Sequence, residues 1–244
     1  MNAIIELLRE HRSVRRFKPE PITSDILETI IQAGSAASTS NFLQAYSVIL
    51  VTDENTRKKV AELAGPQIWV ERCPVFLVFC ADLKRTEIAC EIEGRKMESG
   101  YTEQFMVATV DTALMAQNVM IAAESLGLGG VFIGGIRNDP DTVCELLELP
   151  EHVYPVFGMC LGYPDEQPEK KPRLPVEVIL NRERYQTDNS DVLGRYNETC
   201  LNYYQQRSSQ SRKDTWTQLV SMMMSKAYRT HMKDFLQKKG FLLK

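Results

Sequence analysis

Hydrophobic and polar residues alternate along this chain with two different periods, which predict a domain of mixed helices and strands. Apolar residues recur at helical spacing in the segments 3–10, 24–37, 54–64, 102–126 and 141–147. Short runs of apolar or β-branched residues predict strands at 47–51, 74–81, 130–133 and 156–162. This order of elements indicates an α+β or mixed α/β domain.

Individual residues sharpen some of these elements. Ser24 is expected to cap the helix 24–37, and Asp53 stands where the helix 54–64 begins. The helix 102–126 is apolar nearly all round, so it should lie at the centre of the fold or at a subunit interface. Asp111 and Glu124 within it are expensive in lipid, which favours a buried helix over a membrane span. With no export signal at the N-terminus, we expect a cytoplasmic protein.

The character of the chain changes after about residue 189. The segments 190–206, 214–226 and 229–239 predict polar helices with narrow apolar faces, and the basic stretch 207–213 between them is expected to be mobile. We therefore expect a core of residues 1–188 followed by a helical extension of residues 189–244.

Composition excludes several classes of function. The net charge of −3 argues against nucleic acid as the main partner. The cysteines form no CxxC pair and the histidines lie far apart, so a metal site is not expected. The GxSxG and HExxH motifs are absent, and nothing indicates a nucleophile with its base. Hydride transfer needs neither, because a cofactor makes and breaks the bonds.

Two polar segments near the N-terminus are candidates for ligand binding. The stretch 11–16 contains a histidine, a serine and three arginines, which can form an anion site. The alternative is a solvated basic helix end, where cations also suit the helix dipole. The stretch 38–41 could donate hydrogen bonds to a ligand or form a plain loop. Phe42 beside it could stack on a substrate or be buried in the core.

The glycine-rich stretch 127–135 fits neither common nucleotide motif. Phe132 breaks the dinucleotide-binding GxGxxG pattern, and the Lys-Ser or Lys-Thr of a P-loop is missing. A strand framed by glycines remains. Gly134 and Gly135 at its end would let backbone N–H groups approach a flat ring closely, although a tight turn needs the same residues.

Basic residues recur in two later segments. In 170–175 a proline lies between Lys171 and Arg173 and fixes the backbone, so these two cations would lose little entropy on binding a ligand. This suits a phosphate clamp, and a rigid surface loop is the alternative. Arg207 and Arg212 could recognise a second phosphate, such as the 2′-phosphate of NADPH, or belong to a solvated linker.

Taken in order, these segments resemble the nitroreductase superfamily, and most closely its large, NADPH-preferring group of oxygen-insensitive nitroreductases and flavin reductases. The resemblance covers nearly the whole chain. The stretches that carry it are 11–15 (HRSVR), 37–40 (ASTS), 65–67 (GPQ), 122–129 (AAESLGLG), 133–135 (IGG), 171–175 (KPRLP) and 214–216 (DTW). The resemblance implies a central, mostly antiparallel mixed sheet flanked by helices, in an intertwined homodimer whose two FMN sites are each built from both subunits.

The resemblance also implies roles for single residues. The residues expected to bind FMN are His11, Arg12, Ser13, Arg15, Ser38, Thr39, Ser40, Gln67, Ile133, Gly134, Gly135, Lys171 and Arg173. Of these, His11, Ser13, Lys171 and Arg173 would surround the phosphate, and the residues 38–40 would come from the other subunit. Arg15 would lie by the pyrimidine edge, and Gly134 or Gly135 near flavin N5. Arg207 and Arg212 would bind NADPH, and Phe42 and Trp69 would border the substrate.

The implied activity is a ping-pong cycle in which NADPH gives hydride to FMN and a flat acceptor then takes it. Nitroaromatics, quinones and free flavin are the expected acceptors. A dedicated reductase that supplies reduced flavin to a partner, and a non-catalytic nucleotide-binding module, are the alternatives. Thr39, Asn41 and Trp69 depart from the serines and tyrosine of close relatives, which affects the substrate range.

Overall fold

The computed structural model describes residues 2–207 and 212–244, which form two compact units. The first unit extends to Pro168 and takes in Arg229–Lys244, and the second comprises Glu169–Tyr228. The expected boundary after residue 188 differs from this division, because Phe235 and Phe241 of the C-terminal segment are buried in the core of the first unit. The functional roles given to the two halves of the chain remain predictions.

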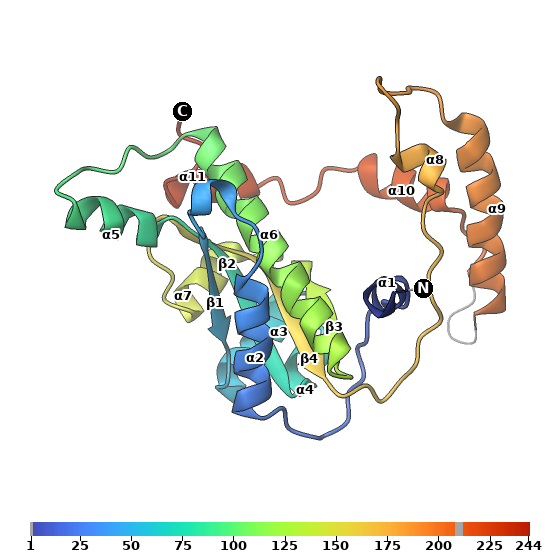
Figure 1. Ribbon diagram of the computed structural model, residues 1–244, viewed down its shortest axis with the longest axis horizontal. Helices are drawn as coiled ribbons and strands as arrows, with labels where there is room; N and C mark the ends of the chain where they lie inside the picture. Colours follow the sequence, from blue (N-terminus) through green and yellow to red (C-terminus); the bar gives the residue numbers. More distant parts are fainter. Residues whose placement is uncertain (1, 208–211) are drawn as a thin grey trace. The chain divides into compact units, whose positions relative to one another are not determined.

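A four-stranded sheet forms the centre of the first unit (Figure 1). The strands are β1 (Tyr46–Leu50), β2 (Val75–Asp82), β3 (Gly129–Ile133) and β4 (Val153–Gly162), in the order β1-β2-β4-β3. All three pairings between them are antiparallel. This confirms the α+β class and the mostly antiparallel sheet.

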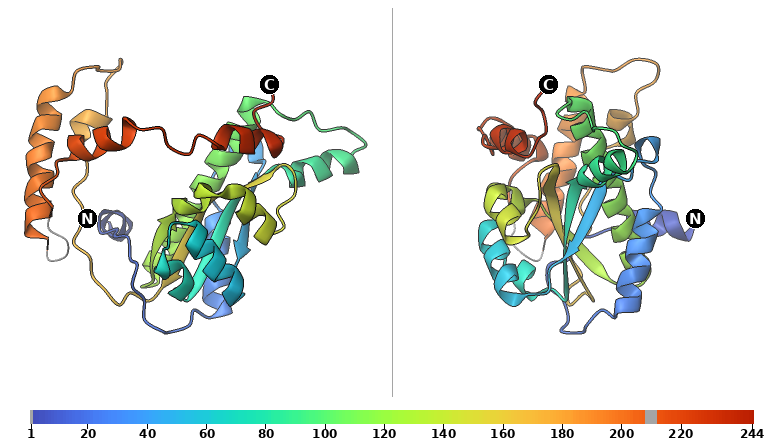
Figure 2. Two further views of the ribbon diagram at one scale, coloured as in Figure 1. Left: turned by 180° about the vertical axis from the view of Figure 1, so that it is seen from behind. Right: turned by 90° about the vertical axis from the view of Figure 1, so that its left-hand side faces the viewer.

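Helices cover both faces of this sheet, as the edge-on view in Figure 2 shows. On one face lie α2 (Ser24–Ser35) and α6 (Thr102–Ser125). On the other lie α3 (Glu54–Leu63), α4 (Ile68–Arg72) and α7 (Pro140–Leu146). Because both faces are covered, every residue of β2 is buried, as its continuous apolar sequence predicts.

Helix α6 is the one helix, among the described residues, that is long and apolar enough to cross a membrane by length and composition alone. It is instead a core helix. Met115, Val119 and Met120 are buried against the sheet, and its charged Asp111 is buried with hydrogen-bond partners. The prediction of a central buried helix is confirmed.

The remaining elements complete each unit. The first unit adds α1 (Ala3–Arg9), α5 (Lys84–Ile92), α11 (Met232–Lys238) and the short 3₁₀ turns η1 (Ser40–Phe42) and η2 (Gly134–Asn138). The second unit consists of α8 (Val176–Ile179), α9 (Ser190–Gln206) and α10 (Trp216–Met224). Asn197 joins α9 to α10 by two hydrogen bonds with Thr217, of 2.8 and 3.0 Å.

The caps correct some expected boundaries. Thr23, not Ser24, caps α2, because its backbone is extended and its Oγ1 accepts from the amide of Ile26. Helix α10 starts at Trp216 rather than 214, since Thr215 forms a capping box with Gln218. Asp53 caps α3 as expected. The sequence did not predict α4, α5 or α8. Helices α4 and α8 are too short for a helical period to repeat, and α5 buries none of its residues.

Candidate functional site

The segment 11–16 leaves α1 and runs along the outer edge of β3. Ser13 forms a parallel bridge with Gly130, and the amide of Val14 donates to the Gly130 carbonyl at 2.9 Å. A side chain at Gly129 would place Cβ 2.8 Å from Val14 Cγ2, so the glycine is what lets the segment approach. Backbone pairing with a buried sheet therefore sets the position of these residues.

Two polar side chains of this segment are held by carboxylates. His11 Nδ1 lies 2.6 Å from Glu124 Oε1 at the end of α6, which leaves Nε2 as the ring nitrogen able to face a ligand. Arg12 Nη2 donates to Glu10 at 2.8 Å. Arg12 Nε is buried and has no hydrogen-bond partner. A buried donor without an acceptor costs folding free energy, so this N–H group is suited to donate to a bound anion.

A cavity of about 370 Å³ lies beside Arg12 in the first unit. Its lining residues are Leu7, Glu10, Arg12, Val14, Glu124, Leu128, Gly129, Pro164, Glu166, Gln167 and Pro168. The cavity therefore joins the expected anion-binding segment to the end of α6 and to the chain that follows β4.

Three of the expected ligand-binding stretches meet around Trp69. The guanidinium carbon of Arg15 lies 5.8 Å from the centre of the Trp69 ring. Trp69 Nε1 donates to Gln67 Oε1 at 3.0 Å, and Gln67 Nε2 donates to the Ala64 carbonyl at 2.6 Å. Gly135 packs against the same amide, since a Cβ there would lie 2.5 Å from Gln67 Nε2. Residues distant in sequence thus lie together, at least partly exposed, around Trp69.

The two glycines after β3 serve different purposes. At Gly135 a Cβ would lie 2.2 Å from the Ala64 carbonyl oxygen, so packing within the protein requires glycine there. At Gly134 the nearest atom to a Cβ is Arg137 Nη2 at 3.4 Å, and φ is not in the left-handed region. The protein itself has room for a side chain at Gly134, and its absence leaves that space to a ligand. Ile133 is buried in the core and can offer only its backbone.

The stretch 38–40 belongs to a different part of the first unit. Asp111 of α6 accepts from the amides of Ser40 and Ala45, at 3.0 and 3.2 Å. Glu124, which holds His11, lies 13 residues further along α6, or about 20 Å at the helical rise. Ser38, Thr39 and Ser40 are therefore not joined to the surface around Arg15 within one chain.

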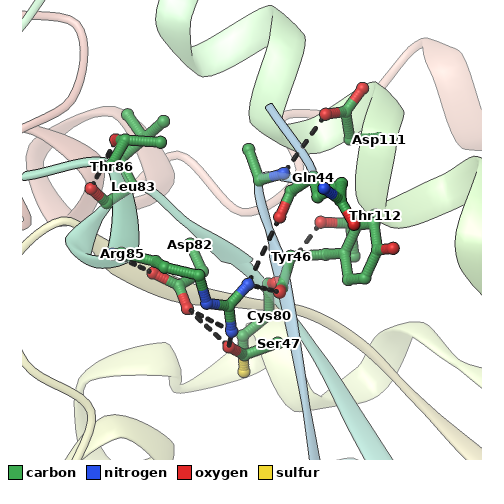
Figure 3. A network of polar contacts seen from close by, with 11 residues as sticks. Gln44, Tyr46, Ser47, Cys80, Asp82, Leu83, Arg85, Thr86, Asp111 and Thr112 are labelled. Atoms are coloured by element: carbon green, nitrogen blue, oxygen red, sulfur yellow. Dashed lines mark hydrogen bonds and ion pairs between the residues drawn. The ribbon is translucent and has the colours of Figure 1, made fainter. Parts of the chain in front are cut away.

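The loop after Ser40 has an unusual backbone. Asn41, Phe42 and Gln44 have φ of 48°, 60° and 52°, although none is glycine. Arg85 fixes its far end by donating to the carbonyls of Gln44 and Tyr46, at 3.3 and 3.0 Å (Figure 3). The loop exposes 80% of Phe42, so this ring lies outside the core.

In the second unit the basic loop lies beside an aromatic cavity. Tyr196 donates its hydroxyl to the Pro172 carbonyl at 3.1 Å, and Arg173 Nη1 donates to the Lys171 carbonyl at 3.1 Å. Burial raises the pKa of the Tyr196 phenol, so it remains a neutral donor. The cavity is about 400 Å³ and is lined by Lys171, Pro172, Arg173, Leu174, Ile179, Tyr196, Cys200, Tyr203, Tyr204 and Trp216.

The expected NADPH residues lie at the end of α9. Arg207 Nε is buried, makes no hydrogen bond and lies 3.9 Å from a carboxylate oxygen of Glu169. The amide of Arg212 donates to the Tyr204 carbonyl at 3.3 Å. The mobile stretch expected between them includes residues 208–211, which lie outside the described residues. His11–Ser13 and Lys171–Arg173 belong to separate units, so their meeting around one phosphate stays a prediction.

Three carboxylates that position site segments were not among the expected site residues: Asp111, Glu124 and Glu166. Asp111 could have been found as a charge within an apolar helix, and Glu124 lies within the stretch 122–129 that carries the resemblance. Glu166 accepts from the amides of Arg15 and Arg16, and no pattern in the sequence indicates it.

The antiparallel sheet covered on both faces, with a cationic segment at its edge, defines an α+β domain equipped for an anionic ligand. Residues 8–163 match the model of the "Nitroreductase family", and residues 171–244 match "Nitroreductase family, C-terminal domain". This chain belongs to the nitroreductase family, as the sequence analysis predicted.

Individual relatives match over nearly the whole chain. The oxygen-insensitive NADPH nitroreductase of Salmonella typhimurium is 44% identical, with 99% of both chains covered. The FMN reductase (NADPH) of Bacillus subtilis is 40% identical, also with 99% of both covered. The solved structure of NADPH:FMN oxidoreductase from Vibrio harveyi complexed with NAD⁺ matches with a TM-score of 0.92 at 42% identity, and both chains are fully covered. The chain is accordingly an enzyme of the NADPH-dependent flavin oxidoreductase and nitroreductase family.

Proposed function

We propose that this enzyme binds FMN and uses NADPH to reduce flat aromatic acceptors. When bound, FMN accepts a hydride from one partner and delivers it to the next. The single observation that carries the proposal is the meeting of Arg15, Trp69, Gln67 and Gly135 at the edge of the sheet.

The residues present suit the phosphate of FMN. Arg12 Nε is a buried donor without a protein acceptor, and His11 presents Nε2 because Glu124 holds Nδ1. Charge-assisted hydrogen bonds to phosphate oxygens satisfy both groups. Ser13 adds a hydroxyl, and Lys171 and Arg173 supply the other side of the proposed clamp.

The surface around Trp69 suits the ring of the cofactor. Arg15 places a positive charge where it stabilises the negative charge that the cofactor gains on reduction. Gln67 and Trp69 border the ring, and the open space at Gly134 lets backbone N–H groups approach it. Ile133 offers backbone alone, in keeping with its burial.

A second copy of the chain would complete each site, in a homodimer. Ser38, Thr39, Ser40 and Phe42 cannot reach the Arg15 surface of their own chain, because Asp111 holds their loop about 20 Å from Glu124 along α6. The same helix exposes an apolar stripe of Met106, Val110 and Leu114, one turn apart. Such a stripe supports contact with another subunit.

NADPH would approach the same flavin face through the second unit. Arg207 and Arg212 supply cations for its 2′-phosphate, and the buried Nε of Arg207 has no hydrogen-bond acceptor in the described chain. The product then leaves and an acceptor takes its place in a ping-pong cycle. Phe42 of the partner subunit and Trp69 would contact nitroaromatics, quinones or free flavin. The names of the relatives, a nitroreductase and an FMN reductase, support both kinds of acceptor.

Absorbance spectroscopy tests the proposal directly. The purified protein should be yellow, or should stay yellow after incubation with FMN and removal of the unbound flavin by gel filtration, and NADPH should bleach it without oxygen. A protein that is colourless after this treatment would contradict the proposal. Steady-state rates with nitrofurazone and with free FMN then separate a broad reductase from a dedicated flavin reductase, because only the broad reductase turns over both efficiently.

A further inference from the structure

We propose that Glu166 is a positioning residue, whose carboxylate holds the backbone at Arg15 so that the guanidinium stays beside the flavin. The inference rests on the proposed function, which places Arg15 at the ring. Glu166 Oε1 accepts from two consecutive amides, those of Arg15 at 2.7 Å and Arg16 at 3.1 Å.

The surrounding backbone shows why a side chain is needed there. On one side, Val14 pairs with Gly130 of β3. On the other side, Phe17 forms a bridge with Pro164, and the amide of Lys18 donates to the Tyr163 carbonyl at 2.9 Å. The segment crosses from one pairing to the other at Arg15 and Arg16. Glu166 supplies the acceptor for the amides at that crossing.

The second observation is the exposure of Arg15 itself. Its side chain is exposed, and Trp69 lies 5.8 Å from its guanidinium carbon. A long, exposed side chain keeps its place only when the backbone that carries it is fixed. A displacement of about 1 Å in a positioning group can have large effects on a reacting centre. Glu166 therefore acts on the flavin through Arg15.

Loss of the hydrogen-bond acceptor at Glu166 and loss of its negative charge should shift the midpoint potential of bound FMN in opposite directions, which makes the proposal testable. Without the acceptor, Arg15 moves away from the ring, reduced flavin loses a stabilising cation, and the midpoint potential of bound FMN falls. If Glu166 acted only through its negative charge, removing that charge would favour the reduced flavin and raise the potential. Glu166→Ala removes both acceptor and charge, whereas Glu166→Gln keeps an oxygen acceptor.

The experiment uses the full-length protein and three measurements. Hydrogen–deuterium exchange of the peptide containing residues 13–18, without cofactor, reports the hold on the two amides. Titration with FMN gives the affinity, and anaerobic redox titration of the bound flavin gives the potential. Asp165→Asn is the matched control, because it removes a neighbouring charge from an exposed side chain but leaves the backbone bond from Asp165 to Arg16.

For Glu166→Ala we expect exchange at least tenfold faster and FMN binding about tenfold weaker. We also expect a potential lowered by about 30 mV, which corresponds to a tenfold weaker preference for the reduced flavin. Glu166→Gln and Asp165→Asn should resemble the wild type in all three measurements.

Two results would overturn the inference. One is wild-type exchange and potential in Glu166→Ala, and the other is a raised potential in both Glu166 variants, which indicates charge alone. Arg15→Ala separates this inference from the proposed function. If Arg15→Ala leaves the midpoint potential of bound FMN unchanged, Arg15 does not lie beside the flavin ring, and the proposed role of Glu166 is refuted as well. If Arg15→Ala lowers the potential and Glu166→Ala does not, only the role of Glu166 is refuted.

Discussion

The cations of the first unit and those of the second are positioned by different means. Around His11–Arg15, strand pairing with β3 and the carboxylates of Glu124 and Glu166 fix the segment. Around Lys171–Arg173, the Tyr196 hydroxyl holds the Pro172 carbonyl beside an aromatic cavity. The first arrangement ties the cations to a buried sheet. The second ties them to two helices that pack through aromatic rings, so we expect the first to be the more rigid.

The largest expected effect tests whether these two regions bind one phosphate. Arg12→Ala and Arg173→Ala should each weaken FMN binding about 10- to 100-fold, because a hydrogen bond to a charged group contributes about 1.5–3 kcal/mol. The double variant should lose less than the sum of the two free energies, since both residues would contact the same group. Fluorescence titration with FMN measures each affinity.

The controls for these affinity measurements are the binding of riboflavin and the variant Arg195→Ala. Riboflavin lacks the phosphate, so its affinity should be unchanged in all three variants. Arg195→Ala removes an exposed cation of the second unit that pairs with Glu177 at 3.1 Å, and it should bind FMN normally. Fully additive losses for Arg12 and Arg173 would show that the two regions do not share a phosphate.

The next effect probes the rigidity of the first unit. Asp111→Asn keeps the shape of the side chain, but its amide group can accept only one of the two backbone donors, from Ser40 and Ala45. Leaving a buried donor unsatisfied costs about 1–3 kcal/mol. Urea unfolding should show this loss, and the amides at 40–45 should exchange faster. Unchanged stability would mean that the loop does not depend on Asp111.

A smaller effect concerns the second unit and the choice of nicotinamide nucleotide. Arg207→Ala should raise the KM for NADPH about tenfold and leave the KM for NADH unchanged, because only NADPH carries the 2′-phosphate. Steady-state kinetics with both nucleotides measures the preference. An unchanged preference would remove Arg207 from the nucleotide site. Arg195→Ala again serves as the control.

The smallest effect compares two buried tyrosines. Burial raises the pKa of Tyr154 in the first unit to about 12 from an ordinary 10.0, although its bond to Thr109 opposes the shift. The unfolded chain therefore loses the phenol proton first as the pH rises. The contribution of Tyr154 to stability is complete below pH 10 and is lost between about pH 10 and 12.

Tyr154→Phe should cost about 1 kcal/mol at pH 8, the value of one hydrogen bond. Its disadvantage should shrink at pH 11, where the wild type is losing the contribution of the phenol. Urea unfolding at the two pH values checks this. A difference that stays constant with pH would contradict the sign. Tyr196→Phe should instead loosen the basic loop and weaken FMN binding, with the first unit as stable as before.

The sequence alone predicted the strands, the long central helix and the family, because these depend on local patterns. Continuous apolar runs gave β2 and β4, and an almost wholly apolar stretch gave α6. The cap at Asp53 was correct, whereas the cap at Ser24 was wrong by one residue, since only the backbone of Thr23 is extended. Helices α4 and α8 were missed because they are too short to show a period, and α5 was missed although it is longer, because it buries none of its residues.

The candidate site shows the same division. Arg12, Arg15, Gln67 and Trp69 were expected from the sequence, because their residue types and motifs are local. Only the tertiary structure decided that Arg15 and Gln67 both lie beside Trp69. It also decided that Glu166 accepts from the amides of Arg15 and Arg16, which lie about 150 residues earlier in the chain. Such contacts depend on how distant strands pair. A sequence specifies which side chains are available, and chain folding determines which of them meet.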